Sequence, residues 1–585
     1  MRNKLAKGVL ASVLAFAMVA PTAACGGTEA GSGDTTLIYV ANFGGGIGRK
    51  WLDEAIVRFK AKIGDKAYEE GKTGVEFNIT HNTNLTFTGT DVAGSGYHIF
   101  FSQGSNAKSL MQEGAFLEIN DVVKSVVDQR NGVDITIEEK IPSESRYIYQ
   151  ASDGNYYGLP YYEYYDGLSY NVDTFNKYGL YLADPAAEGD PWACSLTNQT
   201  VMFVGETSAR KSCGNDGVYG TYDDGLPTTL MEMVAMCDYM DDKGVIPFTV
   251  SKRKLVYSNK MLNGMWFALA GSEQARSAIN FTGSADYVTG FSNDNLFAGN
   301  STIKAPNIEE NASISNATGY KAINQASRYY AAAFMELAVK QSWFDPRSTQ
   351  DSFTHKDAMR AIMFSGIGES EEVGMLIEGT YWYNEAEGYG LTEEYKKYTQ
   401  DQTGVDLQYF NMPTSLNEPV TEGNGRAEAL AVSSGTYSII NGNLKDKADK
   451  QGIIEACKDF LKFLYTDEEL RYFTKSTGAR KGAMDYDASS IIDSLPLYKK
   501  SVMNASALNW DNRVVQSSQN KLYANNTGMF TWGDMSGWTP EFDAMDSYST
   551  FLAAFREGKT ATECFLNTGF TEEGWNAAYS KYFED

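Results

Sequence analysis

The first folded stretch alternates between strand-like and helix-like patterns of hydrophobic residues. Residues 36–40 (TLIYV) form an apolar, β-branched run, and Leu52, Ile56 and Phe59 then recur at helical spacing on one face. Two further strand-like runs, 75–80 and 97–101, alternate with helical segments. This β–α–β order predicts an α/β fold with a mainly parallel sheet and right-handed crossovers.

The loops that follow these strands are the first candidate ligand contacts. Ligands bind beyond the carboxyl ends of parallel strands, which places Asn42, Phe43 and Gln103 at one edge of a cleft. The glycine-rich residues 44–48 (GGGIG) lack the GxGxxG spacing, and no GK[ST] follows them. We therefore interpret them as bare backbone that a ligand can approach closely, rather than as a nucleotide site.

Residues 158–171 (GLPYYEYYDGLSYN) combine five tyrosines with two acids. A sugar has apolar faces and hydroxyl-rich edges, and rings that carry hydroxyls match both. Tyr161, Glu163, Tyr165 and Asp166 are therefore candidate ligand contacts. The same stretch also fits an aromatic-rich strand that is simply buried, and its pattern alone does not decide between the two.

A second aromatic group follows an apolar run at 373–379, which ends in glycine and is predicted to be a strand. Tyr381, Trp382 and Tyr383 come immediately afterwards. Rings directly beyond a parallel strand point into the crevice more often than into the core. We expect Tyr381 and Trp382 to contact ligand, with Trp382 as the stacking surface.

Helical patterns and loops supply the remaining candidates. Thr228 or Thr229 is predicted to cap a helix, and a later helix carries Trp266 in its core with Asn263 as the more exposed residue. A turn at 477–480 presents the cation of Arg480. A glycine-containing loop at 530–538 holds two rings predicted to bind ligand, Trp532 and Trp538.

The N-terminus has the pattern of an exported protein. A basic start, an apolar run at about 8–20 and small residues leading into Cys25 predict a signal peptide over 1–24. Cys25 is then expected to carry lipid, with 25–34 as a flexible tether. Cleavage near Ala24 in an ordinary secreted protein is the alternative. The apolar run is too short to span a bilayer, and no later segment is apolar enough.

Composition narrows the class of protein. The 585 residues, 43% of them hydrophobic, can bury at least two cores. A net charge of −25 argues against nucleic acid and suits a neutral or cationic ligand. The cysteines after Cys25 are odd in number, so they do not form a complete set of disulfides. Cys194 and Cys213 could form one disulfide, or all of these cysteines could be free thiols. The acidic residues 215–227 could bind calcium or form a solvated loop. We expect no metal and no cofactor.

Several motifs occur in an order that resembles a known family. They are the lipobox-like segment, GLPYYEYYDGLSYN, FTHKDAM, MLIEGTYWYNEA, KDFLKFLYTDEEL and TGAR. Together they resemble the extracellular solute-binding lipoproteins of carbohydrate ATP-binding-cassette importers, of the maltose-binding type in its long Gram-positive form. The resemblance implies two α/β lobes of the periplasmic-binding-protein type with a ligand cleft between them. Lobe 1 would comprise 35–158 and 428–490, and lobe 2 would comprise 159–427 and 491–585.

The resemblance also assigns roles to residues. It places the hinge acid at Glu163 or Asp166, the main stacking ring at Trp382, and a late aromatic contact at Trp532 or Trp538. Two features depart from the family. Asn42-Phe43 stands where several relatives have a basic ligand contact, and Ser102-Gln103 replaces an aromatic after the third strand.

Three functions compete at this stage. The resemblance implies an oligosaccharide-binding monomer that serves a membrane permease and is anchored through lipid at the outer face of the cytoplasmic membrane. A surface glycan-adhesion lipoprotein without a transporter is the second. A glycoside hydrolase, for which Glu163, Asp166, Glu378 and Glu385 would supply carboxyl groups, is the third. No hydrolase motif is present, and we expect no enzyme activity.

Overall fold

The computed structural model of the protein describes residues 33–82, 92, 94–103, 107–187, 189–205, 210–315, 317–433, 435–482, 484–516, 550–566, 572–573 and 575–576. Three predicted functional residues, Cys25, Trp532 and Trp538, lie outside the described residues.

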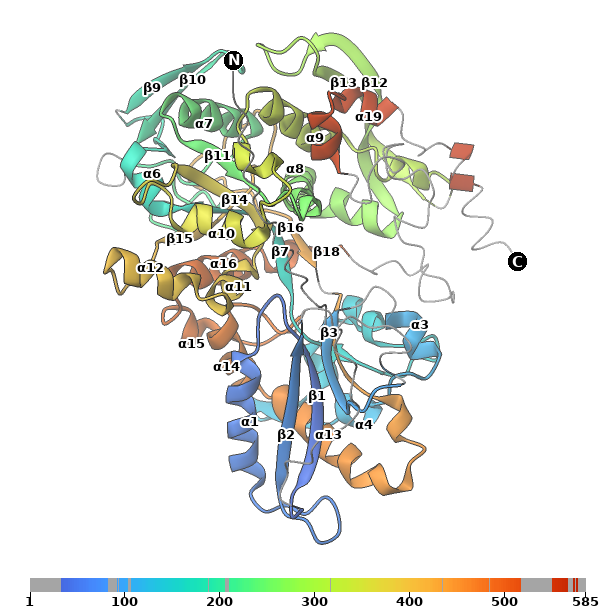
Figure 1. The fold of residues 1–585 in the computed structure, drawn as a ribbon. Coiled ribbons are helices and arrows are strands. Elements are labelled where there is room, and N and C mark those ends of the chain that lie inside the picture. Colours follow the sequence, from blue (N-terminus) through green and yellow to red (C-terminus); the bar gives the residue numbers. More distant parts are fainter. Residues whose placement is uncertain are drawn as a thin grey trace, which may run out of the picture.

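The first lobe, the lower one in Figure 1, is built on a five-stranded sheet in the order β2-β1-β3-β17-β6. β1 (Thr36–Phe43) runs parallel to β2 (Val75–Asn82) and β3 (Ile99–Gln103), which confirms the predicted parallel order. β17 (Thr436–Ile440) joins antiparallel from late in the chain and pairs with β6 (Leu159–Pro160). The other elements of this lobe are α1 (Lys50–Ile63), α3 (Ala107–Gln112), α4 (Asn120–Val123), β4 (Val126–Arg130), β5 (Val133–Thr136), α5 (Ile137–Lys140), η1 (Ser143–Tyr149), α13 (Gln451–Leu464) and α14 (Asp467–Thr477).

The second lobe is built around β7 (Tyr164–Asn171), the strand formed by the tyrosine-rich stretch. β14 (Val373–Gly379) pairs antiparallel with β7 on one side, and β15 (Leu407–Phe410) and β16 (Leu430–Ser433) pair with it on the other. β11 (Ile246–Thr249) lies parallel to β14, and β18 (Arg513–Val515) lies parallel to β16. The carboxyl ends of several strands therefore meet near the junction of the lobes.

Helices and smaller sheets surround this second sheet (Figure 1). They are α6 (Val172–Tyr178), β8 (Tyr181–Leu182), β9 (Asp190–Cys194), β10 (Gln199–Val204), α7 (Leu230–Asp242), η2 (Leu255–Tyr257), α8 (Ser258–Asn280), β12 (Gly283–Asn295), β13 (Lys304–Ile314), η3 (Gly319–Lys321), α9 (Ala326–Lys340), η4 (Pro346–Thr349), α10 (His355–Met363), α11 (Trp382–Gly388), α12 (Leu391–Thr399), α15 (Ser489–Ile492), α16 (Leu497–Leu508), η7 (Trp510–Asn512), α18 (Phe551–Arg556) and α19 (Ala561–Leu566). Two short helices of the first lobe, η5 (Gly442–Leu444) and η6 (Ala448–Lys450), precede α13.

Within the described residues the chain crosses between the two sheets at three places. It passes from β6 to β7 through residues 161–163, returns from β16 to β17 after Ser433, and leaves α14 for α16 through residues 478–496. β16 itself belongs to the second sheet, so the return to the first lobe begins a few residues later than the expected boundary at 428. Few covalent links therefore join the lobes.

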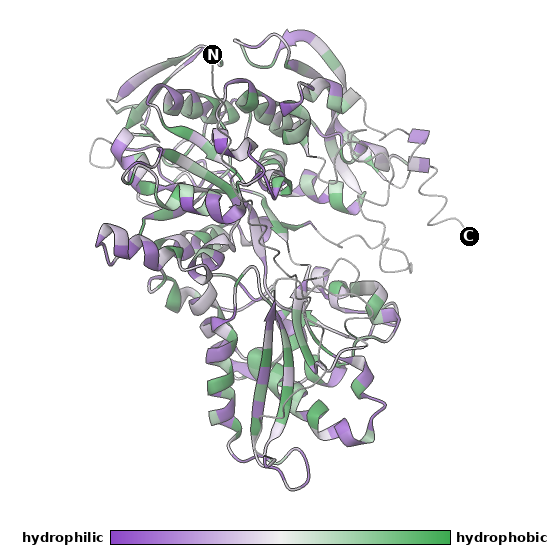
Figure 2. Ribbon diagram, viewed as in Figure 1, coloured by the Kyte–Doolittle hydropathy of each residue, from purple (hydrophilic) through white to green (hydrophobic). Residues whose placement is uncertain are grey.

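Buried hydrophobic residues form two large clusters, as the composition predicts. One fills the first lobe and continues beneath α10 to α12, and the other surrounds α7, α8 and α9 in the second lobe. In Figure 2 hydrophobic residues accordingly gather in strands of the two central sheets and along parts of the helices, whereas the outer hairpins are largely hydrophilic. Trp266 is fully buried, as predicted.

Helix starts also follow their sequence signals. The Thr229 hydroxyl accepts the backbone N–H of Glu232 at 3.0 Å, and the Glu232 carboxylate accepts the Thr229 N–H at 2.9 Å, closing a capping box on α7. Thr466 caps α14 by accepting the Glu469 N–H. The start of α7 is the one predicted from the sequence.

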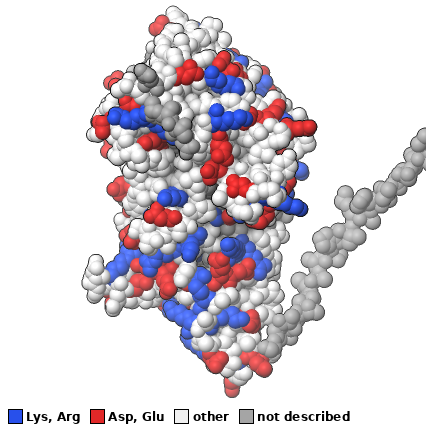
Figure 3. Space-filling view, turned by 90° about the vertical axis from the view of Figure 1, so that its left-hand side faces the viewer, with Lys and Arg blue, Asp and Glu red and all other residues white. Residues whose placement is uncertain are grey.

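The described part of the chain contains no helix that is long and apolar enough to cross a membrane. Acidic and basic side chains are interspersed on the face drawn in Figure 3, so this face carries no patch of a single sign. Cys194 and Cys213 are both buried free thiols, which decides the open question of their pairing against a disulfide.

Candidate functional site

A cavity of about 370 Å³ lies between the lobes, where elements of both sheets converge. The first lobe contributes the ends of β1 and β3, and the second contributes β7, η2, α8, the β14–α11 junction and the ends of β16 and β18. The lining residues are Phe43, Gly46, Gln103, Tyr164, Asp166, Val256, Tyr257, Asn259, Lys260, Asn263, Tyr381, Glu385, Ser433 and Gln516.

The loop after β1 brings bare backbone to the cavity. Gly46 has a φ of 65°, and a Cβ added to it would lie 2.4 Å from the Tyr162 hydroxyl. Only glycine fits there, because both the left-handed backbone and the close approach of the ring exclude a side chain. The Tyr162 hydroxyl also accepts a hydrogen bond from Gln103 Nε2 at 2.7 Å, which fixes that amide at the cavity wall.

Asp166 is the centre of a polar network on the second-lobe wall. Its carboxylate lies 2.7 Å from Lys260 Nζ and accepts hydrogen bonds from Asn263 Nδ2 at 3.1 Å and Gln516 Nε2 at 2.7 Å. Burial disfavours the charge of Lys260, but Asp166 and Tyr164 outweigh this effect and raise the pKa of the ammonium. Lys260 Nζ also lies 4.5 Å from the centre of the Tyr164 ring.

A second acidic group lies on the β14–α11 side of the cavity. Glu385 Oε1 accepts the Gly46 N–H at 2.6 Å, a contact that links α11 to the first lobe. Glu378 accepts the Tyr381 hydroxyl at 2.9 Å and the Gly379 N–H at 3.0 Å. Burial raises the pKa of Glu385 to about 7. Burial together with the neighbouring Glu385 raises the pKa of Glu378 to about 8.

The cavity combines flat rings with fixed hydrogen-bonding groups. Phe43, Tyr164, Tyr257 and Tyr381 supply ring surface, and Tyr164 and Tyr381 pack edge to face with centroids 4.8 Å apart. The amides, Lys260 and the carboxyl groups supply donors and acceptors on both lobes. This arrangement can hold a small polyhydroxylated molecule by its faces and its edges.

Five of the predicted site residues line this cavity: Phe43, Gln103, Asp166, Asn263 and Tyr381. Of the two candidates for the hinge acid, Asp166 lies at the cavity and Glu163 does not. Their roles as ligand contacts remain predictions.

Trp382 is the main correction. Its side chain is fully buried, and its indole N–H donates to Ser169 Oγ at 2.9 Å. The sequence prediction was that rings directly beyond the strand would point into the crevice. In the structure α11 begins at Trp382, so neighbouring side chains are turned by a helical step. Tyr381 consequently lies at the cavity, and Trp382 packs against Tyr498 in the core.

Five other predictions are corrected because the side chains are buried with partners of their own. The Asn42 amide donates to His81 Nδ1 and accepts the Tyr161 hydroxyl at 3.1 Å. The Tyr165 hydroxyl donates to Glu163, and Glu163 in turn pairs with Arg513 at 2.9 Å.

Arg480 is the fifth side chain in this class. Its guanidinium donates to Ser506 Oγ at 3.2 Å and to the Tyr486 carbonyl at 3.2 Å, and it lies 4.4 Å from the Trp510 ring centroid. Its backbone carbonyl accepts the Glu163 N–H at 3.2 Å. Asn42, Tyr161, Glu163, Tyr165 and Arg480 therefore support the hinge and the first-lobe core rather than line the cavity.

Sequence reasoning missed most of the second-lobe wall. Lys260, Tyr257 and Asn259 occur in no recognisable motif, and Gln516 follows a three-residue strand. Glu385 was noted only as a carboxyl group available to a hydrolase. The signal that could have found it is its position one helical turn after Tyr381, on the same face of α11.

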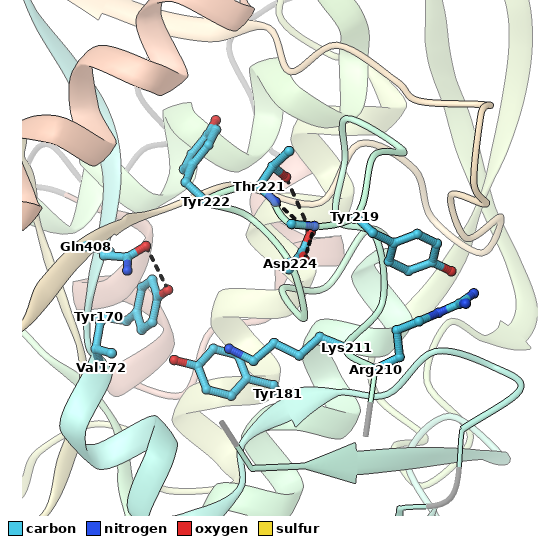
Figure 4. A pocket seen from close by; sticks show the side chains of 11 residues that line it. Tyr170, Val172, Tyr181, Arg210, Lys211, Tyr219, Thr221, Tyr222, Asp224 and Gln408 are labelled. Atoms are coloured by element: carbon cyan, nitrogen blue, oxygen red, sulfur yellow. Dashed lines mark hydrogen bonds between the residues drawn. The ribbon is translucent and has the colours of Figure 1, made fainter. Parts of the chain in front are cut away.

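A second cavity, of about 460 Å³, lies beside β7, β15 and the acidic loop and is shown in Figure 4. Arg210 and Lys211 lie along one side of it, over the rings of Tyr219 and Tyr181. Arg210 is also paired with Asp184 at 2.7 Å. All of its lining residues belong to the second lobe, so it offers no contacts from both lobes, and we assign no ligand to this cavity.

The acidic loop beside the second cavity does not form a cation cage. The Asp223 carboxylate accepts the N–H groups of Asn215 and Asp216, and Asp224 accepts that of Gly220 at 2.7 Å. No group of three or more acidic, histidine or cysteine side chains suited to a metal occurs among the residues that the structure describes. The loop is better explained by its own backbone hydrogen bonds than by calcium.

No protein-family model and no curated protein sequence matches this chain. A solved structure of a chitin oligosaccharide binding protein is similar, with a TM-score of 0.51 and 14% identity over 94% of this chain and 100% of that chain. The bacterial solute receptor AcbH, described with an exclusive preference for β-D-galactopyranose, gives a TM-score of 0.45 and 12% identity over 94% of this chain and 98% of that chain. The first likeness shows the fold: this chain has the two-lobe α/β architecture of a solute receptor.

Proposed function

We propose that this protein is a receptor that binds a carbohydrate, an oligosaccharide of a few residues, and delivers it to an ATP-binding-cassette membrane permease. The observation that carries the proposal is the cavity between the lobes, where ring faces and buried hydrogen-bonding groups converge from both sheets. The fold shared with a chitin oligosaccharide binding protein supports it.

The composition of the cavity favours a sugar over other neutral ligands. A purely apolar ligand would leave Asp166, Lys260 and the surrounding amides without compensation for their lost water, which is costly. A sugar hydroxyl both donates and accepts, so it can join the Asp166 network at any of these groups. The rings of Tyr164 and Tyr381 then cover the apolar face of the sugar ring.

Capture by closing lobes suits a receptor that releases its ligand to a transporter. Three crossings join the lobes, and the Gly46–Glu385 hydrogen bond spans them. A hinge of this kind closes on a ligand that contacts both lobes. Small-angle scattering should show a smaller radius of gyration when saccharide is bound. A glycan-adhesion protein with a rigid site would show no change in the radius of gyration.

We further propose that the protein is held at the outer face of the cytoplasmic membrane by lipid on Cys25, with residues 25–34 as a tether. In cells, Cys25→Ala should release the protein into the medium. A variant that stays with the cells as fully as the parent would refute the anchor and leave the binding proposal intact.

Catalysis is not part of the proposal. Asp166 is tied to Lys260 and two amides, and Glu385 is bonded to the Gly46 backbone, so both acids have structural partners. A reducing-sugar assay with the best-bound oligosaccharide should show no release of product over the protein-free control. Turnover would move the assignment to a glycoside hydrolase.

The direct test is a thermal-shift screen against a panel of oligosaccharides, since a ligand that binds only the folded state raises its melting temperature. Asn263→Ala removes an amide of the cavity wall and should weaken the best ligand about tenfold or more. Glu273→Ala, an exposed position on the same helix, is the matched control and should bind as the parent does. A panel without any stabilising saccharide would contradict the proposed function.

A further inference from the structure

The two carboxyl groups on the β14–α11 side of the cavity have no cation of their own. Among the described lining residues Lys260 is the one basic side chain, and Asp166 holds it at 2.7 Å. Glu378 and Glu385 are left to hydroxyl and amide donors. The lining residues therefore include two acids, Asp166 and Glu385, and one base, Lys260, and Glu378 is a further acid buried next to Glu385.

Glu385 also has an unused acceptor. Its Oε1 accepts the Gly46 N–H, whereas its Oε2 is buried without a hydrogen-bond partner among the described residues. An acceptor in this state costs free energy until a donor reaches it. The Glu385 side chain lines the cavity, so a rotation of its carboxyl group would bring Oε2 within reach of a donor on a ligand.

The groups around these carboxyls do not remove the imbalance. The titratable and charged side chains that interact with these carboxyls are Tyr162, Tyr257, Tyr381, Tyr389, Tyr498 and Lys260, and Lys260 is in turn paired with Asp166. Burial raises the pKa of Tyr257 and Tyr381, so these phenols stay neutral donors. Lys260 is the sole positive charge in this set, and Asp166 already offsets it.

We propose that the cavity selects a saccharide that carries a protonated amine, an amino sugar with its nitrogen unacylated, and that Glu385 receives this ammonium group. The inference rests on the proposed carbohydrate-binding function and names the ligand class of the same site. An ammonium supplies a charge-assisted donor to Oε2 and restores the charge balance with Glu378. The Tyr381 and Tyr257 rings beside it are suitable neighbours for a cation.

The proposal predicts that binding is coupled to proton release. Buried carboxyl groups without a cation hold part of their protons near neutral pH, with the pKa of Glu385 at about 7. A cationic group lowers the pKa of a neighbouring carboxyl, so a ligand that arrives with its amine already protonated must expel the protons that these groups hold. A neutral sugar brings no charge, so its binding should release fewer protons.

The test is calorimetry with two matched probes: a glucosamine trimer with free amines and the same trimer fully N-acetylated. Near neutral pH the amine form should bind at least about tenfold more tightly to the wild-type protein. Glu385→Gln keeps an acceptor for the Gly46 N–H but removes the charge, and should reduce this preference to about threefold or less. Glu393→Gln, an exposed acid on α12, is the control and should keep the full preference.

Repeating the wild-type titration at about pH 6, where the amines are protonated before binding, in two buffers of different ionisation enthalpy measures the proton release without any variant. The amine trimer should release protons, and the acetylated trimer should release fewer. Equal or tighter binding of the acetylated trimer, or binding of the amine form without proton release, would overturn the inference. If some neutral oligosaccharide binds but the amine trimer does not, the inference fails and the proposed function stands; if no saccharide binds, the proposed function fails.

Discussion

Lys481 provides a test of how the first lobe is stabilised. Its side chain is fully buried, and its Nζ has no hydrogen-bond partner among the described residues. The ring centroids of Trp51, Phe473 and Tyr465 lie 4.4, 4.5 and 5.0 Å from this nitrogen. Burial lowers the pKa of Lys481 from 10.5 to about 7, with Glu469 acting weakly in the opposite direction. We predict that Lys481→Met stabilises the protein.

The size of the effect follows from the two pKa values. A fall from 10.5 to about 7 corresponds to roughly 5 kcal/mol of free energy at about 1.4 kcal/mol for each tenfold change in the ionisation constant. The surrounding rings return about 2 kcal/mol through cation–π contacts. The charged lysine should therefore lower the free energy of unfolding by about 3 kcal/mol. Methionine matches the length of the lysine stem and carries no charge to bury.

The pH dependence has a definite sign. Because the folded-state pKa lies below the unfolded-state value, the folded protein binds fewer protons than the unfolded chain between about pH 7 and pH 10.5. The cost of Lys481 is thus fully present below about pH 7 and fades as the pH rises towards 10.5. The advantage of Lys481→Met should be largest near pH 6 and clearly smaller near about pH 9.

Urea unfolding at several pH values, followed by circular dichroism, measures this difference. Lys62→Met, at an exposed position on α1 of the same lobe, is the control and should show no pH-dependent gain. The reasoning would be refuted by a Lys481→Met protein that is less stable than the parent at every pH, or by a difference that does not change with pH.

Two further predictions separate core residues from cavity residues. Trp382→Ala should lower the free energy of unfolding by about 3 to 5 kcal/mol, measured by urea unfolding, because it leaves a cavity at a fully buried site. A variant with native-like stability and a selective loss of ligand affinity would instead show that Trp382 contacts the ligand in the cleft. Gly46→Ala should weaken saccharide binding and lower the melting temperature, because its Cβ would lie 2.4 Å from the Tyr162 hydroxyl at a left-handed φ. Calorimetry with Gly33→Ala as the control, where nothing lies within 4 Å, would count against this account if both variants bound equally well.

The elements of the first lobe could be predicted because local pattern and tertiary structure agree there. β1, α1 and β2 follow their hydrophobic periods, and in the second lobe Thr229 caps α7 as predicted. The antiparallel strand β17 could not be placed by this means, because it joins the sheet from a distant part of the chain.

The site was less predictable because its chemistry depends on long-range contacts. Asp166 and Tyr165 are neighbours in β7, and Asp166 lies at the cavity whereas Tyr165 lies in the core. The alternation of the two side chains is predictable from the strand. Which face of the strand meets the cleft is not, because it depends on the pairing of β7 with β14 and β15. Glu163 was predicted to contact the ligand, but in the structure it is paired with Arg513, which lies far along the chain. No sequence pattern marks Lys260 as a site residue, because its pairing with Asp166 arises only when α8 packs against β7.

The most direct test of the central claim is a crystal structure of the protein with its best-bound oligosaccharide. We predict a sugar ring between the lobes, with one face against Tyr164 or Tyr381 and hydroxyls bonded to the Asp166–Lys260 network and to Gln103 of the first lobe. A saccharide bound instead at the cavity beside Arg210 and Tyr219, or at any surface outside the interlobe cavity, would contradict the account.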